Sequence, residues 1–528
     1  MPNDTIINPI LRGFNPDPSI LRVGDDYYIA VSTFEWFPGV VIHHSRDLVN
    51  WRILARPLDR SELLDMRGNP PSGGVWAPCL SYADGLFYLI YSDAKAHGRM
   101  KDVHNYVTTA PSATGPWSAP TYLNSSGFDP SLFHDEDGKS WLLNMLYDHR
   151  PGRNRFAGIV LQEFDRTSKS LKGNIRNIFP GTALGFTEGP HLYRHNGLYY
   201  LMCAEGGTAL NHAVTVARAS SIGGPYEVDP HNPMLTSADS PTAELQKAGH
   251  ASLVETSAGE AYIAHLCGRP IARKGRCTLG RETALQKVEW SADGWLRLCG
   301  GGSAPRLIVE APGLPPCPWP AIDPKDDFDS PALGPQYQTP RYPIDPADMS
   351  LSARPGYLRL VGRESPVSRH RQSLVARRVQ EFRVSVSTCV EFDPEDFQQM
   401  AGLILLYDTE NFFYLRVSRD EKLGKCVGVL SWDRSKPEQP GADVRIDGMG
   451  RCFLKAEIDH DLLRCYYGPD GEEWKALGPV LDVSRLSDEY CAREFEGAFT
   501  GMFAGIACQD LSGRRKFADF DFFEYREN

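Results

Sequence analysis

Apolar and polar positions repeat in a fixed layout along the first three hundred residues. In the first copy, Asp17 and its following proline open an apolar run, a polar pair turns the chain near residue 25, and aromatic and apolar residues fill 27–31. Similar layouts begin at 77, 129, 188 and 250, spaced 52 to 62 residues apart. Asp-Gly and Asn-Gly pairs between the apolar runs are typical of hairpin turns, because both central residues need positive φ. Each copy therefore predicts antiparallel strands.

This period predicts a propeller. It exceeds the repeat length of helical solenoids and fits a four-stranded blade with loop insertions. Five copies predict five blades over residues 1–300. Equivalent positions of successive blades surround one axis, so we expect the repeat starts to form one ring: Asp17, Trp76–Ala77, Asp129, Glu188 and His250. Relative to the proline, Glu188 lies one residue earlier than the two aspartates.

A second domain is expected after a proline-rich linker at 301–325. From residue 326 to 528 the apolar positions alternate with period two, as in 399–407, 412–417, 453–458 and 517–525, and glycines mark the turns. That pattern predicts a β-sandwich. The segment 497–505 is unusually apolar, and we expect it to present an aromatic ring to the first domain.

Charge and cysteine usage restrict the partners and the compartment. A net charge of −11 over 528 residues disfavours nucleic acid and anionic membranes as partners. No apolar run approaches the roughly 18 residues of a membrane span, and the N-terminus has no signal-peptide pattern. Twelve cysteines are scattered singly, which favours buried thiols in a reducing compartment over disulfides or zinc. We expect a cytoplasmic protein.

The ring of carboxylates predicts acid–base chemistry. Glycoside hydrolysis needs one group that protonates the leaving oxygen and a carboxylate on the other side of the sugar. We assign Asp17 as the general base and Glu188 as the general acid, with Asp129 raising the pKa of Glu188 or orienting it. Arg281 is expected to counter the carboxylates and to bind a sugar hydroxyl, or else to pair with Glu282. A structural explanation, acids that cap inner strands, competes with this one.

Aromatic residues and His250 complete the candidate site. Phe34 and Trp36 are expected either to stack on a sugar ring or to pack within their own blade. Trp76 is expected either to face the axis or to be a core tryptophan. His250 is either structural or a ligand, through its ring nitrogen, of a calcium-like cation whose other ligands are mostly waters. Zinc is less compatible with a single imidazole.

The three acidic motifs, 15–19, 127–131 and 187–191, together resemble glycoside hydrolase family 43. The resemblance covers the whole chain and is to two-domain β-xylosidases, in which a five-bladed propeller precedes a concanavalin-like β-sandwich of jelly-roll type. It implies an inverting mechanism with Asp17 as base, Asp129 as pKa modulator and Glu188 as acid. It also implies exo-cleavage of xylo-oligosaccharides, a homo-oligomer (dimer or tetramer), no required cofactor, and calcium near His250 in some members. The implied one-sugar pocket is lined by Phe34, Trp76, Ala77, Thr208, His250, Arg281 and Phe503.

Two other functions compete with β-xylosidase. The same propeller suits an α-L-arabinofuranosidase or an arabinanase, and arabinofuranosidase is also expected as a side activity because the two pentoses present similar hydroxyls. A propeller that binds carbohydrate without cleaving it belongs to a different class. The complete set of three carboxylates argues against that last alternative.

Overall fold

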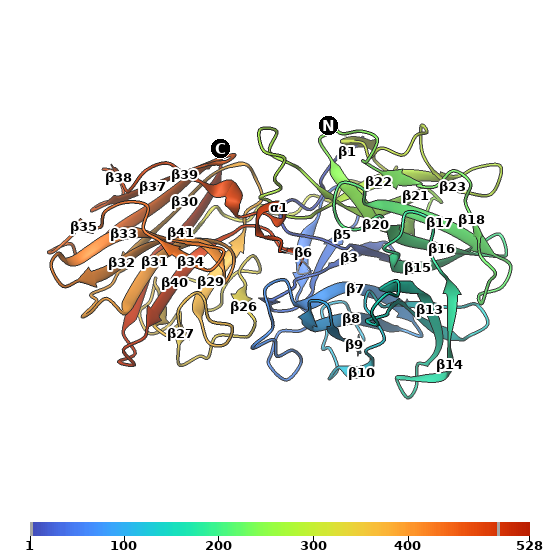
Figure 1. The fold of residues 1–528 in the computed structure, drawn as a ribbon, viewed down its shortest axis with the longest axis horizontal. Helices are drawn as coiled ribbons and strands as arrows, with labels where there is room; N and C mark the ends of the chain where they lie inside the picture. The colour runs from blue at the N-terminus through green and yellow to red at the C-terminus, as the bar shows by residue number, and fades with distance from the viewer. Residues whose placement is uncertain (1–3, 494–496) are drawn as a thin grey trace.

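The computed structural model describes residues 4–493 and 497–528, which form two lobes side by side (Figure 1). The N-terminal lobe, blue to green, contains the repeats, and the C-terminal lobe, yellow to red, contains the period-two strands. Among the described residues, helix is confined to one turn of 3-10 helix, η1 (Val483–Arg485), and one short α-helix, α1 (Asp488–Cys491). The protein is all-β, as predicted.

The N-terminal lobe is a five-bladed propeller. Within the described residues, four blades are four-stranded sheets, and the fourth blade carries one additional short strand. The first two blades comprise β2 (Ser19–Val23), β3 (Asp26–Val31), β5 (Val41–Ser45) and β6 (Arg52–Ala55), then β7 (Gly74–Ala83), β8 (Leu86–His97), β9 (Lys101–Ala110) and β10 (Thr121–Asn124). The third comprises β11 (Ser131–His134), β12 (Ser140–Tyr147), β13 (Phe156–Asp165) and β14 (Ser170–Phe179).

The remaining blades close the circle. The fourth comprises β15 (Glu188–His195), β16 (Leu198–Glu205), β17 (Ala213–Ala219), β18 (Glu227–Val228) and β19 (Leu235–Thr236). The fifth comprises β20 (Gln246–Glu255), β21 (Ala261–Gly268), β22 (Glu282–Trp290) and β23 (Leu296–Leu298). The innermost strands contact one another in sequence, and β20 returns to β2. The predicted turns have the expected backbone: Asp84 and Gly85, for example, have φ of 50° and 77°.

The C-terminal lobe is a sandwich of two antiparallel sheets. One contains β27 (Met349–Ser350), β28 (Leu358–Val361), β41 (Phe517–Glu527), β30 (Arg383–Glu391), β36 (Cys452–Asp459), β37 (Leu462–Gly468) and β38 (Lys475–Ala476), with β25 (Lys325–Asp326) and β39 (Leu481–Asp482) at its margins. The other contains β29 (Ser373–Arg378), β40 (Phe503–Asp510), β31 (Gln399–Asp408), β32 (Asn411–Asp420), β33 (Gly424–Asp433), β34 (Lys436–Glu438) and β35 (Val444–Arg445). Their inner faces enclose one apolar core.

The two lobes share a second apolar core. Phe14 and Trp36 of the propeller pack in one buried cluster with Leu406 and Phe503 of the sandwich. Beside this cluster, β4 (Trp36–Phe37) pairs with β26 (Thr339–Pro340) across the domain boundary. The sandwich is therefore fixed against the propeller, which allows it to contribute to a site at the propeller axis.

The segment between the lobes follows the first blade. The last blade strand ends at Leu298 and β25 begins at Lys325; between them, β24 (Ile308–Glu310) pairs with β1 (Thr5–Ile7). Further on, the Trp319 ring packs 3.8 Å from the guanidinium carbon of Arg52 and 5.3 Å from the His44 ring. The proline-rich segment thus lies against blade one.

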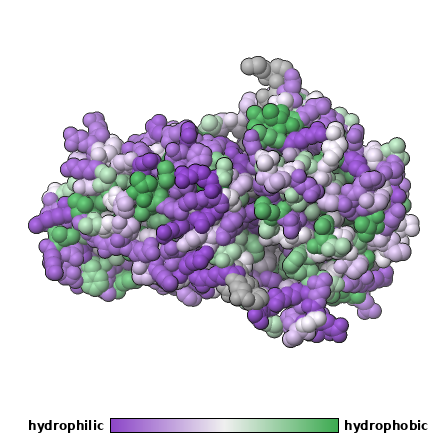
Figure 2. All heavy atoms as spheres, turned by 45° about the horizontal axis from the view of Figure 1, so that its top comes forward, coloured by the Kyte–Doolittle hydropathy of each residue, from purple (hydrophilic) through white to green (hydrophobic). Residues whose placement is uncertain are grey.

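The molecular surface is predominantly hydrophilic on the face drawn in Figure 2, where apolar residues are scattered among polar ones. In the part of the chain that the structure describes, no helix is long and apolar enough to cross a membrane.

Candidate active site

The repeat starts share an unusual backbone conformation at the propeller axis. Asp17, Ala77, Asp129, Gly189 and His250 have φ of 54°, 30°, 54°, 56° and 44°. The left-handed region costs a residue other than glycine about 1–3 kcal/mol and persists where the surrounding fold enforces it. In the fourth blade, Gly189 is therefore the equivalent of Asp17 and Asp129. Glu188 precedes it by one residue, as the comparison of the repeats on their prolines indicated.

A cavity of about 220 Å³ lies over these turns. It contains eight of the ten residues predicted for the site: Asp17, Phe34, Trp76, Asp129, Glu188, Thr208, His250 and Arg281. It is smaller than the roughly 300–1,000 Å³ of pockets that hold drug-sized ligands. The space is therefore suited to a single small polar ring.

The carboxylate of Asp17 is held in its ionised form. The Ser32 hydroxyl donates a hydrogen bond of 2.6 Å to Asp17 Oδ2, and Arg281 Nη1 donates to Asp17 Oδ1 at 3.3 Å. His250 Nδ1 lies 3.7 Å from the same oxygen. Burial opposes ionisation, but Arg281, His250 and Ser32 outweigh it, so the pKa of Asp17 is lowered. Asp17 is a carboxylate that can accept a proton.

The carboxyl group of Glu188, in contrast, is held in its protonated form. Burial is the main cause that raises its pKa, and the neighbouring charge of Asp17 raises it further, to about 8 against an ordinary value of 4.5. Arg281 and Lys101 lower it in part. At neutral pH Glu188 therefore retains a proton that it can donate. Asp17 and Glu188 line one cavity with opposite protonation, which is the arrangement that separates a base from an acid.

Asp129 holds the backbone next to Glu188. Its Oδ2 accepts a hydrogen bond of 3.0 Å from the backbone N–H of Gly189, the residue after Glu188. Burial raises the pKa of Asp129 well above its ordinary value, and the charges of Glu188 and Asp17 add to the shift. Asp129 thus fixes the backbone that carries Glu188. The charge of Asp17 raises the pKa of Glu188. Glu188 and Asp129 also oppose each other's ionisation, so the role of Asp129 as pKa modulator stays a prediction.

Lys101 is a cavity residue that the sequence analysis missed. Its ammonium donates to the His97 carbonyl at 2.8 Å and lies 5.5 Å from the ring centroids of both Trp76 and Tyr147. Burial lowers the pKa of Lys101 to about 8, although Glu188 raises it. Nothing in the repeat pattern marks Lys101, because it begins the third strand of its blade and has no counterpart at the repeat starts.

Aromatic rings form the cavity wall. The rings of Phe34 and Trp76 each lie 6.0 Å from that of Phe499, which comes from the sandwich. The Arg281 guanidinium lies 5.2 Å from Phe34 and 5.1 Å from Phe499, and its Nη2 donates to the Phe499 carbonyl at 2.9 Å. Phe128, Phe156 and Phe186 line other parts of the cavity and were also missed.

Phe503 was predicted to line the pocket, and this prediction is wrong. It is fully buried and stacks on Trp36 with centroids 3.7 Å apart, in the core between the lobes and outside the cavity. The predicted segment 497–505 does reach the cavity, but through Phe499. Phe503 begins β40, and its side chain points to the core because strand alternation sets its direction.

Ala77 also lies outside the cavity lining. Its backbone N–H donates a hydrogen bond of 2.7 Å to the hydroxyl oxygen of Ser32, and that hydroxyl donates to Asp17. Ala77 therefore supports the carboxylate from behind.

His250 lines the cavity, and a calcium-like cation held there by one imidazole and waters stays a prediction. Among the described residues no group of three or more His, Cys, Asp and Glu side chains is arranged to hold a metal. The carboxylate nearest His250 is Asp17, which already pairs with Arg281. Calcium prefers six to eight oxygen ligands, so nearly all of them would have to be waters. No step below depends on a metal.

A five-bladed propeller with a basic carboxylate and a protonated carboxylic acid in one small aromatic cavity defines a glycoside hydrolase. Comparison with known families agrees. The model described as glycosyl hydrolases family 43 matches residues 6–296, and the model of the β-xylosidase C-terminal concanavalin A-like domain matches residues 325–526. The chain belongs to glycosyl hydrolases family 43.

Similar proteins match over nearly the full length. A β-xylosidase of Bacillus subtilis is 49% identical over 99% of both chains, and a xylosidase/arabinosidase 43B of Humicola insolens is 50% identical over 98% of this chain and 97% of its own. The crystal structure of a xylan β-1,4-xylosidase from Bacillus halodurans superposes with a TM-score of 0.97 at 55% identity, covering 99% and 100% of the two chains. The concanavalin-like assignment of the sandwich is thereby confirmed.

Proposed function

We propose that the protein is an inverting, exo-acting β-D-xylosidase that releases xylose from the non-reducing ends of xylo-oligosaccharides. The observation that carries this proposal is the pair of opposite protonation states in one cavity: the pKa of Asp17 is lowered, and that of Glu188 is raised to about 8.

The proposed reaction is one displacement. Glu188 donates its proton to the glycosidic oxygen as the bond to the anomeric carbon breaks. Asp17 removes a proton from a water that attacks the opposite face of that carbon, so the product has inverted configuration. An inverting enzyme keeps its two carboxyls roughly 6.5–9.5 Å apart to admit the water.

Supporting residues set up this displacement. Arg281 keeps Asp17 ionised and reaches the sandwich through the Phe499 carbonyl. Asp129 holds the Gly189 backbone so that the Glu188 carboxyl keeps its direction. Charge develops on the sugar ring in an oxocarbenium-like transition state, and the Asp17 carboxylate stabilises it electrostatically.

Exo-cleavage follows from the size of the cavity and from its two-domain wall. About 220 Å³ leaves space for one sugar ring in the catalytic position, and Phe499 contributes to the wall from the sandwich. Apolar C–H faces of a pentose can pack on Phe34 and Trp76 while the hydroxyls meet charged groups. A chain end fits such a site, whereas the middle of a polymer needs an open groove.

The choice of xylose rests on the relatives. The four relatives that are 45–50% identical over nearly the whole chain are named for xylosidase activity, and the Humicola protein is also named for arabinosidase activity. A non-reducing end α-L-arabinofuranosidase of Bacteroides ovatus matches over 99% of the chain at 33% identity. We therefore include α-L-arabinofuranosidase as a side activity. Rates on the nitrophenyl β-xyloside and α-L-arabinofuranoside measure the preference directly, and a higher kcat/KM for the arabinofuranoside would reverse the assignment.

Xylotetraose labelled at its reducing end tests the exo mode. The expected labelled products appear stepwise as trimer, dimer and monomer, with free unlabelled xylose from the first turnover. Simultaneous early appearance of labelled dimer and unlabelled dimer would indicate internal cleavage. Glu188→Gln is the matched inactive control.

We further propose that these oligosaccharides are hydrolysed in the cytoplasm. All twelve cysteines lie within the described residues and are free, and ten of them are buried, which suits a reducing compartment.

A further inference from the structure

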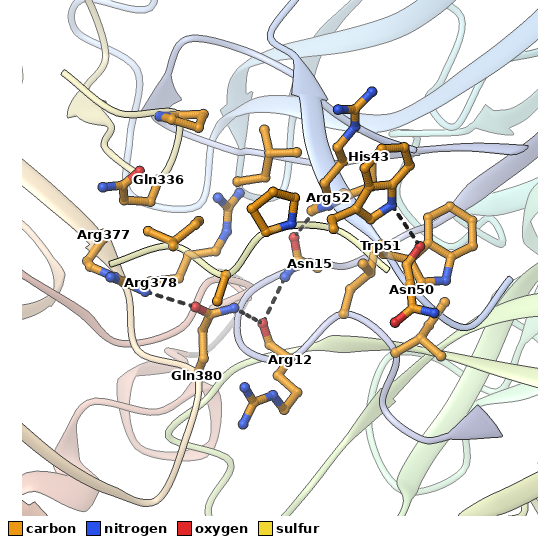
Figure 3. A pocket seen from close by; sticks show the side chains of 18 of the residues that line it. Arg12, Asn15, His43, Asn50, Trp51, Arg52, Gln336, Arg377, Arg378 and Gln380 are labelled. Carbon is orange, nitrogen blue, oxygen red and sulfur yellow. Dashed lines mark hydrogen bonds between the residues drawn. The ribbon is translucent and has the colours of Figure 1, made fainter. Parts of the chain in front are cut away.

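A second cavity, of about 550 Å³, lies between blade one, the proline-rich segment and the sandwich (Figure 3). Asn15 and His43 line it from the propeller, and Arg377, Arg378 and Gln380 line it from the sandwich. The residues that line it are distinct from those of the carboxylate cavity. It therefore has to be explained separately from the hydrolytic site.

The charged residues that line this cavity are all positive. Four arginines line it, Arg12, Arg52, Arg377 and Arg378, and none of its described lining residues is an aspartate or glutamate. Arg12 is neutralised by Glu381 and Glu527. The other three have no ion pair with any described residue. In a protein with eleven excess negative charges, such a cavity is a concentrated positive site.

The two sandwich arginines are buried as well as unpaired. Arg377 is 8% exposed and Arg378 is 5% exposed. Arg377 Nη2 donates to Gln380 Oε1 at 3.2 Å and Arg378 Nε donates to the Phe14 carbonyl, but Arg377 Nε and Arg378 Nη2 have no hydrogen-bond partner. A buried guanidinium without a counter-ion is destabilising, and an acceptor in the cavity that reaches the remaining N–H groups of Arg377 and Arg378 would offset that cost. Figure 3 shows both side chains along the cavity.

Neighbouring groups add to the positive potential. Arg56 donates twice to the carbonyl of Pro335, which forms part of the wall, and its Nη1 has no partner. His43 is neutral, because burial and the charges of Arg378 and Arg56 lower its pKa well below the ordinary value, and it hydrogen-bonds Asn15. Besides Arg12 and Arg52, the propeller wall thus supplies neutral polar groups and no carboxylate.

We propose that this cavity binds an oxyanion, a phosphate or a carboxylate, carried by a small organic molecule. Guanidinium groups recognise both chemistries through paired N–H donors. Trp51, Trp319 and Ile322 supply apolar surface for the organic part, and Ile322, 49% exposed, lies at a rim open to solvent.

Anion binding there would join the two domains. Arg378 is the residue of β29 that pairs with Phe503 of β40, and Asn15 lies two positions before Asp17. An anion held by Arg377, Arg378 and Arg52 therefore connects the sandwich to blade one and stabilises the docked arrangement, by an amount that grows with ligand concentration.

The test measures binding by calorimetry and the thermal midpoint of the full-length protein in a Tris chloride buffer. Inorganic phosphate and citrate are the two probes, added at constant ionic strength, with sodium chloride as reference. A saturable rise in Tm with phosphate identifies a phosphate site, and one with citrate identifies a carboxylate site. Equal small effects of all three salts, or none, would overturn the proposal.

Variants assign the binding to this cavity. Arg377→Gln and Arg52→Gln should each weaken the affinity for the probe that binds, phosphate or citrate, on the order of tenfold or more, since each removes charged hydrogen bonds. Arg60→Gln, an exposed arginine paired only with Asp59, should bind as the native protein does. Arg377→Gln should also fold at least as stably without anion, because it removes an unpaired buried charge. Unchanged affinity in both cavity variants would refute the site.

Discussion

Arg281 contacts Asp17 with one end of its guanidinium, Nη1 to Oδ1 at 3.3 Å, and the backbone of the sandwich domain with the other, through the Phe499 carbonyl at 2.9 Å. One side chain therefore sets the charge of the proposed base and ties it to the second domain. Within the propeller alone, Arg281 would lose one of these two anchors.

Arg281→Gln should move the whole pH profile of kcat/KM upward. Arg281 lowers the pKa of both Asp17 and Glu188, so its removal raises both. The acid limb, where Asp17 becomes protonated, and the basic limb, where Glu188 loses its proton, then both shift to higher pH. A profile with unchanged limbs and only a lower maximum would assign Arg281 to substrate binding alone.

Lys101→Met should shift the basic limb alone. Lys101 lowers the pKa of Glu188 but is absent from the interactions that set the pKa of Asp17. Without its charge, Glu188 should retain its proton to a pH above about 8, and activity should persist further into the alkaline range. The comparison of this variant with Arg281→Gln separates the two limbs, and a shifted acid limb in Lys101→Met would contradict the assignment.

Glu188→Gln should lose about 10²–10⁴ in kcat on xylobiose, the range attributed to general acid catalysis. The loss should be smaller on an aryl xyloside whose leaving group needs little protonation. Equal losses on both substrates would point to a binding role.

Glu188→Gln should also be more stable than the native enzyme, by an amount that grows as the pH rises. The pKa of Glu188 is about 8 in the folded state against 4.5 ordinarily, so the folded protein binds more protons between these values and loses stability as pH increases through them. Glu188→Gln removes this loss. Its Tm advantage over the native enzyme should therefore be larger at pH 9 than at pH 5, and an advantage that is the same at both pH values would show that Glu188 is ionised throughout this range.

Phe499→Ala and Phe503→Ala should separate function from folding. Phe499 lines the cavity, so its loss should lower kcat/KM about tenfold or more with a small change in Tm. Phe503 is fully buried against Trp36, so its loss should cost about 3–5 kcal/mol of unfolding free energy. Thermal melts and kinetics on the two purified variants distinguish these outcomes. A loss of kcat/KM in Phe503→Ala with little change in Tm would instead support the sequence prediction that Phe503 lines the pocket.

The sequence predicted the fold and the carboxylates for a physical reason. Repeated turns mark equivalent positions of equivalent blades, so Asp17 and Asp129 could be placed at one axis before any coordinates, and the offset of Glu188 was visible against its proline. Both features depend on local backbone chemistry.

Residues outside the repeat could not be placed in the same way. Phe499 and Phe503 lie in one apolar segment, and which ring reaches the cavity depends on where β40 begins and on what covers each face. Lys101 begins β9, the third strand of its blade, and only the folded blade places it in the cavity where it lowers the pKa of Glu188. The arginine cavity joins segments near residues 15, 320 and 378, which only the docked domains bring together.

The configuration of the newly released sugar tests the central claim most directly. Proton NMR of xylobiose hydrolysis, recorded within the first minutes before mutarotation, reports the anomer formed by the enzyme. With Asp17 activating water across the ring from Glu188, the α-xylose signal should appear first and the β signal should follow as mutarotation proceeds. Initial accumulation of β-xylose would contradict the account, because it requires a carboxylate that bonds to the sugar in place of one that deprotonates water.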